Sequence, residues 1–166
     1  MIDVLFIIPN SSKKAYQGLA DHYSAIEPPT WALLLANAVR KKNFICQILD
    51  CDALRLNEND AIKEIEYIKP RLSCFVLYGQ NPNSGTTSMI GAESLANAIK
   101  ESSSNSKIAF IGSHVSALPR EVLELSSVDF ILYNEGVYGL IELLNTNLNS
   151  KLENCRSLGF KSGGDL

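Results

Sequence analysis

Five short apolar runs, separated by longer amphipathic stretches, constrain the fold of this chain of 166 residues more than any other feature. The runs are rich in Ile, Val, Leu and Phe and are nearly continuous. A strand with one face in water would alternate apolar and polar residues, so continuous runs indicate strands covered on both faces, as in a parallel sheet. The predicted strands span residues 2–8, 44–50, 73–79, 107–112 and 128–134.

Helical patterns occupy the gaps between these runs. The predicted helices span residues 30–42, 59–70, 86–102, 118–125 and 136–144. The apolar face of the first one is predicted to consist of Trp31, Leu34, Leu35 and Ala38. Thr30 is its expected N-cap, and Asn43 can take the left-handed conformation that ends many helices. Pro119 opens the fourth helix, at a position where proline is favoured.

The repeated order of a strand followed by a helix predicts a doubly wound α/β fold. Parallel strands need such crossovers, and nearly all of them are right-handed. Five strands favour the flavodoxin-like order 2-1-3-4-5, with its switch point between the first and third strands. This pattern covers residues 1–145. Residues 146–166 are rich in Asn, Ser and Gly and are expected to be a linker or an edge element leading to another domain.

Composition and charge argue against several classes of function. The net charge of −3 and the pI of about 5.4 leave no basic surface for nucleic acid or for an anionic membrane. No apolar run approaches the ~20 residues of a membrane span, and the N-terminus does not resemble a secretory signal. The cysteines lack a complete metal-ligand spacing and are expected to be reduced, in a cytoplasmic protein; they are Cys46, Cys51, Cys74 and Cys155.

The loops after the first, third, fourth and fifth strands are the expected ligand site, because ligands of such sheets lie outside the carboxyl ends of the strands. These loops are residues 9–29, 80–88, 113–117 and 134–136. They carry amide, hydroxyl and glycine groups rather than charge, which suits a large and mostly neutral ligand. The chain shows no G-x-G-x-x-G, phosphate-loop, G-x-S-x-G or H-E-x-x-H motif.

Each of these features also has a purely structural interpretation. Gly112 is compatible with a tight turn, and His114 with an ordinary loop histidine. Residues 80–88 are compatible with a helix-capping loop, and Glu135 with a favourable position at the positive end of the last helix. The functional interpretation depends on their convergence at one edge of the sheet.

Several motifs occur in a characteristic order between residues 2 and 145: VLFIIPN, PPTWALLLANAVRKKNFICQILD, LANAIKE, FIGSHVSALPREVLE and VDFILYNEGVYGLIELL. This order resembles the cobalamin-binding, Rossmann-like domain at the N-terminus of cobalamin-dependent radical S-adenosylmethionine (SAM) enzymes. That family typically has Gly-Gly-x-His, a small residue and Leu-Pro-Glu-Glu, then Val-Asp-Phe, a strand and Gly-Glu-Gly. These last two blocks are the more specific ones.

The chain departs from the family at four positions. Ser113 replaces a second glycine, Asn134 stands where the family often has glycine, and Trp31 and Asn43 replace common glycines. The Asp-x-His-x-x-Gly motif, by which some cobalamin domains supply a histidine to cobalt, is also missing, since Tyr-Ser-Ala follows His22. The resemblance therefore implies that no histidine of this chain binds cobalt and that no residue is a metal ligand.

The resemblance also implies a set of cofactor-binding residues in three groups. Those beside the nucleotide tail of the cofactor are Gly112, Ser113, His114, Asn134, Glu135 and Gly136. Those of the opposite wall are Tyr78, Gly79, Ser84, Thr86 and Thr87. Those facing the corrin ring lie between residues 10 and 16 and include Asn10, Ser11 and Tyr16.

The function implied by the resemblance is cobalamin binding by the cofactor domain of a radical SAM methyltransferase-type enzyme. Such enzymes also use S-adenosylmethionine and a 4Fe-4S cluster, held by a C-x₃-C-x₂-C run in the catalytic domain that follows. This chain has no such run, so it is expected to present the cofactor without that domain and to catalyse little. One alternative is a stand-alone regulatory or interaction domain with a flavodoxin-like fold and no cofactor. Another is a flavin-binding protein, which the first loop disfavours because it lacks a dense Ser/Thr/Gly phosphate cradle.

Overall fold

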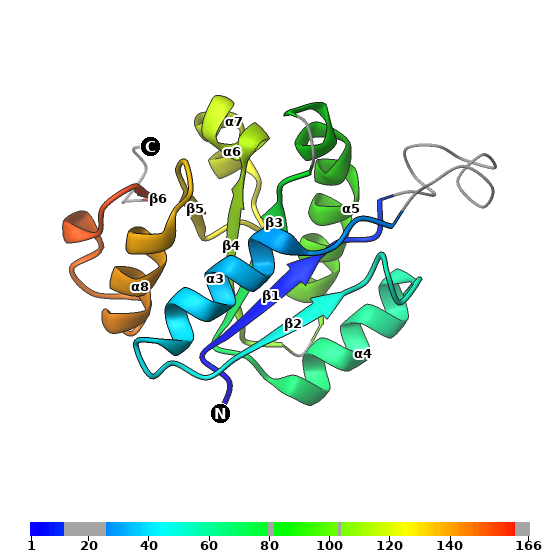
Figure 1. The fold of residues 1–166 in the computed structure, drawn as a ribbon, viewed down its shortest axis with the longest axis horizontal. Helices are drawn as coiled ribbons and strands as arrows, with labels where there is room; N and C mark the ends of the chain where they lie inside the picture. The colour runs from blue at the N-terminus through cyan, green and yellow to red at the C-terminus, as the bar shows by residue number, and fades with distance from the viewer. Residues whose placement is uncertain (12–25, 80–81, 103, 162–166) are drawn as a thin grey trace.

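The structure, a computed structural model, describes residues 1–11, 26–79, 82–102 and 104–161. Strands and helices alternate along most of the chain, as Figure 1 shows. In chain order the elements are β1 (Val4–Ile8), α3 (Thr30–Arg40), β2 (Cys46–Asp50), α4 (Glu58–Ile68), β3 (Leu72–Leu77), α5 (Pro82–Glu101), β4 (Lys107–Gly112), α6 (Ser113–Ala117), α7 (Pro119–Glu124), β5 (Phe130–Leu132), α8 (Val137–Asn145), the 3-10 turn η2 (Leu152–Asn154) and β6 (Leu158–Phe160).

The sheet has the strand order β2-β1-β3-β4-β5-β6. The first five strands are parallel, which confirms the predicted doubly wound fold and the order 2-1-3-4-5. The sixth strand was not predicted: β6 pairs antiparallel with β5, with Ile131 opposite Gly159. It belongs to the segment 146–166 and covers the edge of β5. Three residues are too few to produce a recognisable strand pattern in the sequence.

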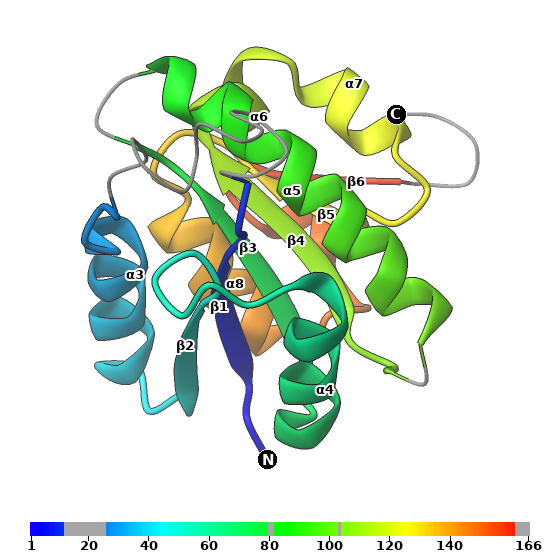
Figure 2. The same cartoon turned by 90° about the vertical axis from the view of Figure 1, so that its right-hand side faces the viewer.

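Two apolar cores lie on opposite faces of the sheet, which explains why the strands are continuously apolar. In β1, Leu5 and Ile7 point into one core and Val4 and Phe6 into the other. Helices α4, α5, α6 and α7 cover the first face, and α3 and α8 cover the second (Figures 1 and 2). A strand buried on both faces loses the alternation that marks a half-exposed strand.

The predicted first helix needs two corrections. Pro29, not Thr30, is the N-cap of α3, and the Thr30 hydroxyl lies 3.5 Å from the carbonyl oxygen of Pro28. Leu34 was expected to be buried but is 54% exposed, because the buried stripe is displaced from the predicted one; it consists of Ala32, Leu35, Ala36 and Val39. Both stripes have helical spacing, and the small Ala32 and Ala36 allow the helix to approach the sheet closely. Asn43 has φ 63°, as predicted for the end of this helix.

Two segments predicted as loops are helical. Helix α5 begins at Pro82, four residues before the predicted start, so Ser84, Thr86 and Thr87 lie in its first turns. Proline is compatible with the first turn of a helix because its missing N–H has no partner there. Residues 113–117, predicted as a loop, form the short helix α6.

Asp129 ties the start of β5 to its neighbours. Its carboxylate accepts hydrogen bonds from Lys100 Nζ at 2.6 Å, Lys107 Nζ at 3.0 Å and the backbone N–H of Ile108 at 2.8 Å. Burial alone would raise the pKa of this carboxyl, but the bonds from Lys100, Ile108 and Lys107 outweigh burial and lower its pKa. The carboxylate form is therefore the one that stabilises the fold.

Replacing Asp129 by asparagine is expected to lower the free energy of unfolding at pH 7 by about 1–2 kcal/mol, because charge-assisted bonds are lost in a partly exposed site. Since the folded-state pKa is lowered, the stabilisation is complete above the ordinary pKa of about 3.9 and disappears as the pH falls through the folded value. Urea unfolding at pH 7 and pH 3 measures both effects. Asp60→Asn, at the exposed pair with Lys63, is the matched control; an equal loss in both variants would contradict this role of Asp129.

Candidate functional site

The carboxyl ends of β1, β3, β4 and β5 lie at one edge of the sheet, at the upper side of Figure 2. The chain leaves β1 towards α3 on one face and leaves β3 towards α5 on the other face. The switch point therefore lies between β1 and β3, where open α/β sheets form a crevice for ligands. Residues of all four predicted loops border this edge.

The loop after β1 is anchored to the protein through the residues that the structure describes. Asn10 Nδ2 donates to the carbonyl oxygen of Leu56 at 3.2 Å, and Ser11 Oγ donates to that of Ser88 at 3.0 Å. Ser11 is buried and Asn10 half-buried. Tyr16 and His22 lie outside the described residues. The two described residues hold the start of this loop between α5 and the loop that precedes α4.

The ends of β3 and β4 approach each other closely. A Cβ atom on Gly112 would lie 2.8 Å from both the carbonyl carbon and the Cβ of Leu77, and closer still to the Leu77 oxygen. A Cβ on Gly85 would lie 2.9 Å from the same oxygen and would collide with Ser113 Oγ. Glycine is therefore required at Gly112 by the packing of the protein itself, and Ser113 packs against the first turns of α5.

His114 links the two helices that follow β3 and β4. Its Nδ1 lies 3.0 Å from Thr86 Oγ1, with Thr86 exposed and His114 half-buried. Ser84 stands beside Gly79, and its carbonyl oxygen accepts the hydroxyls of Thr87 at 3.0 Å and Ser88 at 2.8 Å. The predicted residues on α5 and α6 thus come together, and the exposed Thr86 lies at the surface of the group.

The end of β5 is connected to β4 and β3 by hydrogen bonds. Ser116 Oγ donates to the carbonyl oxygen of Gly112 at 3.0 Å and accepts the backbone N–H of Asn134 at 2.8 Å. The Tyr78 hydroxyl donates to the carbonyl oxygen of Asn134. Burial, assisted by the nearby negative charge of Glu135, raises the pKa of Tyr78 to about 12, so this hydroxyl keeps its proton throughout the neutral range.

Asn134, Glu135 and Gly136 form the turn between β5 and α8. Asn134 has φ 53° and Gly136 has φ 58°, both in the left-handed region, and Gly136 is the N-cap of α8. Gly136 is buried, and a Cβ atom there would lie 2.6 Å from Ile111 Cδ1. Asn134 and Glu135 are exposed. The side chains available to a ligand at this turn are therefore those of Asn134 and Glu135.

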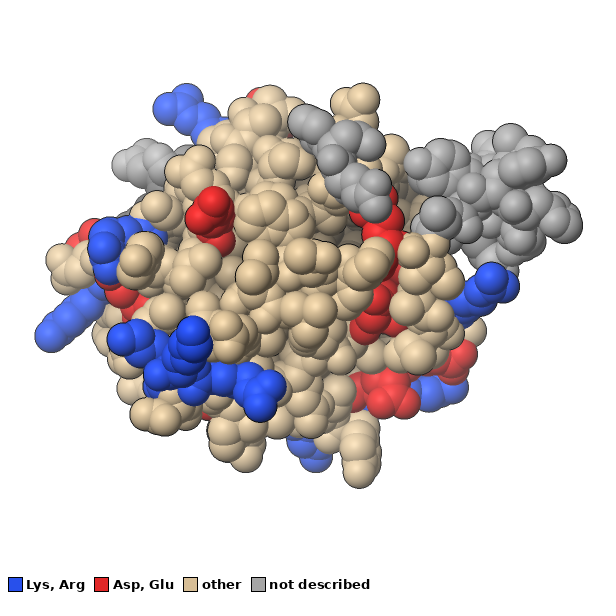
Figure 3. Space-filling model, viewed as in Figure 1, with Lys and Arg blue, Asp and Glu red and all other residues tan. Residues whose placement is uncertain are grey.

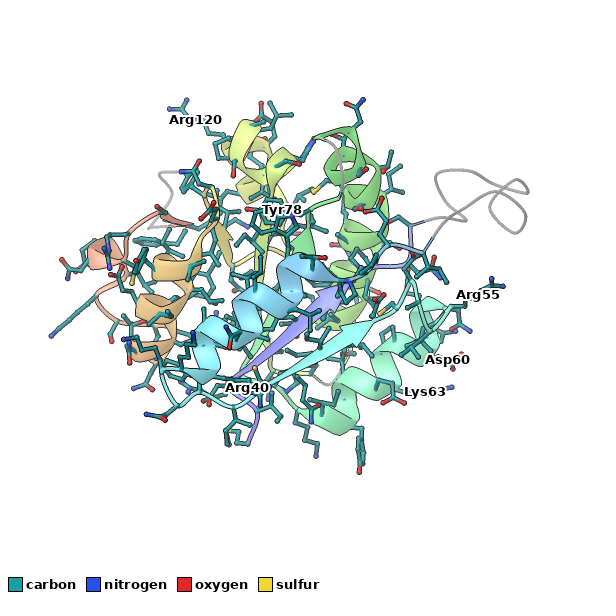
Figure 4. The ribbon with its side chains drawn as sticks, viewed as in Figure 1. Arg40, Arg55, Asp60, Lys63, Tyr78 and Arg120 are labelled. Atoms are coloured by element: carbon teal, nitrogen blue, oxygen red, sulfur yellow. The ribbon has the colours of Figure 1, made fainter. Side chains whose placement is uncertain are left out.

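Two residues of this region were missed as site residues by the sequence analysis. Trp31 stacks on Tyr78 with 4.5 Å between ring centroids and 26° between ring planes. Ser116 makes the bonds to Gly112 and Asn134 described above. Figure 4 shows Tyr78 beside the first turn of α3. Trp31 carried a signal, since it replaces a common family glycine next to the switch point, whereas the role of Ser116 depends on contacts that the sequence does not show.

The edge is polar but only weakly charged. In Figure 3, Lys and Arg side chains gather at the lower left, whereas the visible described surface of the upper half is mostly uncharged, with an acidic group left of its centre. The exposed basic residues Arg40, Lys41 and Lys42 lie at the end of α3, away from the carboxyl edge. Over the described ranges, no group of three or more His, Cys, Asp or Glu is placed to hold a metal ion. Burial raises the pKa of Cys51 and of Cys74 to about 12, so these thiols remain protonated.

A cavity of about 420 Å³ lies at the opposite edge, between Lys69–Arg71 and Ser104–Ser106. Its charges do not favour one kind of ligand, because Glu66 lines it beside Lys69, and Arg71 is already paired with Asp3 at 2.9 Å. The chemistry of the carboxyl edge makes that edge the better candidate. Within the part of the chain that the structure describes, no helix is both long and apolar enough to cross a membrane.

The fit of a large ligand differs between the rim and the interior of this edge. Thr86, Asn134 and Glu135 are exposed at the rim and offer hydrogen-bonding groups to a ligand lying across it. Inside, the contact of Ser113 with Gly85 occupies one face of the sheet and the stack of Trp31 on Tyr78 the other. The rim offers hydrogen-bonding groups, whereas protein atoms already occupy these positions beside the strands.

A doubly wound, mostly parallel sheet with neutral polar groups at its carboxyl edge defines a Rossmann-like ligand-binding domain. Residues 16–144 match the model of the B12 binding domain, and the chain belongs to that family. Comparison with curated proteins finds no match.

Solved structures share the fold. One is the radical S-adenosylmethionine methyltransferase TsrM from Kitasatospora setae with tryptophan substrate and a SAM analogue bound (TM-score 0.74, 14% identity, 98% of this chain and 29% of that chain). Another is TsrM from Kitasatospora setae with cobalamin and a [4Fe-4S] cluster bound (TM-score 0.72, 14% identity, 98% of this chain and 30% of that chain). A third is the cobalamin-dependent S-adenosylmethionine radical enzyme OxsB with aqua-cobalamin and S-adenosylmethionine bound (TM-score 0.73, 15% identity, 99% of this chain and 21% of that chain). This chain spans less than a third of those proteins.

Proposed function

We propose that this chain binds cobalamin at the carboxyl edge of its sheet, as the cofactor domain of a radical SAM methyltransferase-type enzyme. The observation that carries the proposal is the match of residues 16–144 to the B12 binding domain. TsrM and OxsB, which share the fold, are solved with cobalamin bound. Cobalamin, when bound, supplies a cobalt centre that can carry a methyl group; the catalytic domain, with its cluster and S-adenosylmethionine, would belong to the parent enzyme.

The proposed roles of the residues are those that the resemblance implies, and Tyr16 among them lies outside the described residues. The corrin would lie against Asn10, Ser11 and Tyr16. His114, Asn134 and Glu135 would lie beside the nucleotide tail, and Thr86 would belong to the opposite wall of its pocket. The remaining residues of the proposed site would position the backbone and the nucleotide tail; they are Tyr78, Gly79, Ser84, Thr87, Gly112, Ser113 and Gly136.

A single experiment tests cobalamin binding, because Trp31 is the only tryptophan of the chain and lies at the proposed site. Titration with hydroxocobalamin in the dark should quench its fluorescence, since the corrin absorbs in the range where indole emits. The corrin spectrum should remain with the protein after desalting. At about 100 times the dissociation constant, binding adds about 2.7 kcal/mol of stability, which raises the midpoint by about 5–10 °C. Unchanged fluorescence, colour and midpoint would refute cobalamin binding by this chain on its own.

Cobalt is proposed to receive no histidine from this chain. Neither His22 nor His114 has the Asp-x-His-x-x-Gly context of a cobalt-binding histidine. The electron paramagnetic resonance spectrum of the bound cob(II)alamin should therefore lack the nitrogen splitting of an axial imidazole or benzimidazole. His22→Ala and His114→Ala should leave this spectrum unchanged. A nitrogen splitting that one of these substitutions abolishes would overturn this part of the proposal.

A stand-alone interaction or regulatory domain is the second candidate function. The contacts of Ser113 with Gly85 and of Trp31 with Tyr78 favour it, because they occupy space beside the strands. Under this alternative, neither hydroxocobalamin nor methylcobalamin is retained, even when the chain is joined to a radical SAM catalytic domain. Retention by the joined protein alone would instead support the cofactor domain.

A further inference from the structure

The stack of Trp31 on Tyr78 lies directly at the switch point of the sheet. Trp31 is the second residue of α3, the helix that follows β1, and Tyr78 is the first residue after β3. These two strands are neighbours, and their connections leave on opposite faces. The pair therefore stands on the α3 side of the crevice where a doubly wound sheet binds its ligands.

The pair is held from both ends. Trp31 is carried by the first turn of α3, and Tyr78 donates its hydroxyl to the carbonyl oxygen of Asn134 at the end of β5. The position of Asn134 is in turn fixed by Ser116, which accepts its N–H. Both rings also pack against the core beneath α3 and α8. The aromatic pair thus forms a continuous connection from α3 across β3 to the start of α8.

The connection decides how deeply a ligand can enter on this face. A flat group entering between α3 and the sheet would meet the two stacked rings before the strands. Both rings are half-buried, so the pair occupies this entrance rather than offering two free faces to a ligand. Some ligands must first displace such a contact. Their apparent affinity is the intrinsic affinity multiplied by the fraction of molecules in which the contact is open.

We propose that Trp31, through its stack on Tyr78, limits the entry of the nucleotide tail of cobalamin on the α3 side of the sheet and so sets the affinity of the site. This inference rests on the proposed function. A stacked aromatic pair shifts the equilibrium between its open and its closed arrangement about 2- to 10-fold towards the closed one. Shortening Trp31 should therefore tighten cobalamin binding, whereas most substitutions in a binding site weaken it.

The test compares hydroxocobalamin with cobinamide, which has the corrin but lacks the nucleotide tail. Trp31→Ala should lower the dissociation constant of hydroxocobalamin about 5-fold and leave that of cobinamide unchanged. Trp31→Phe, which retains a stacked ring, should bind both ligands like the original chain. Tyr78→Phe keeps the stack but loses the bond to Asn134 and should show a smaller gain. Calorimetric titration measures all four proteins.

Tyr67→Ala is the matched control, because Tyr67 is 85% exposed near the end of α4 and should affect neither ligand. Weaker hydroxocobalamin binding by Trp31→Ala, or equal gains for hydroxocobalamin and cobinamide, would overturn the inference and leave cobalamin binding itself intact. If Trp31→Ala does not fold, the absence of any gain in Tyr78→Phe overturns it. Failure of every variant and of the original chain to bind either ligand would refute cobalamin binding by this chain on its own, and this inference with it.

Discussion

Replacing Gly112 by alanine is expected to destabilise the ligand-free chain by about 3 kcal/mol, at the upper end of the cost of overpacking a core. The added methyl group would meet the carbonyl group of Leu77, with 2.8 Å to its carbon and less to its oxygen. Because Leu77 is paired with Gly112 where the neighbouring strands β3 and β4 end, its backbone cannot move without breaking this part of the β3–β4 pairing. Urea unfolding of the ligand-free proteins measures the loss.

Gly159→Ala is the matched control for this substitution. A Cβ atom there would lie 2.6 Å from Ile131 Cγ1, a side-chain atom rather than a backbone atom, so the loss should be smaller. The comparison also separates two roles of Gly112. If Gly112→Ala has nearly the original stability but no longer retains hydroxocobalamin, the space beside Gly112 serves the ligand and not the packing of the strands.

Phe110→Ala is expected to lower the free energy of unfolding by about 3–5 kcal/mol, the cost of removing a large buried ring. Phe110 is fully buried and lies opposite Phe75 in the neighbouring strand, with 5.0 Å between ring centroids. The two rings fill the core between the sheet and α5, two residues before the end of β4. Thermal and urea unfolding should both report the loss.

Phe110→Leu controls for hydrophobicity and should cost less than about 1.5 kcal/mol, because leucine refills most of the space. Phe110 lies below the proposed site. Saturation with hydroxocobalamin at about 100 times the dissociation constant should therefore stabilise Phe110→Ala and the original chain equally, by about 2.7 kcal/mol. A loss below 1 kcal/mol in Phe110→Ala would contradict the packing of this core, and a weaker cofactor effect would show that the site extends into it.

The sequence predicted the architecture correctly because the strands and most of the helices have strong local patterns. The five parallel strands and their order followed from continuous apolar runs alternating with helical stripes. The family was recognised from the blocks FIGSHVSALPREVLE and VDFILYNEGVYGLIELL, and the match over residues 16–144 confirms it. The individual cofactor-binding residues remain predictions, to be tested by the binding experiments described above.

The errors occurred where local patterns are weak or ambiguous. The buried face of α3 was displaced because two stripes of the same helix have the same spacing. Residues 82–88 and 113–117 resemble loops in composition, yet they are helical in the folded chain. Thr87 and Ser88 bond back to the carbonyl oxygen of Ser84, and Gly85 lets α5 pack against Ser113.

The sequence by itself determined the five parallel strands and their order, because these depend on the periodicity of neighbouring residues and on general rules of chain connection. It also predicted the carboxyl edge of the sheet as the ligand site, which the binding experiments test. Only the tertiary structure decided what occupies that edge. The stack of Trp31 on Tyr78 and the bond from Tyr78 to Asn134 join residues that are 47 and 56 positions apart. Contacts over such separations depend on how closely the ends of different strands approach, and no pattern of neighbouring residues encodes that distance.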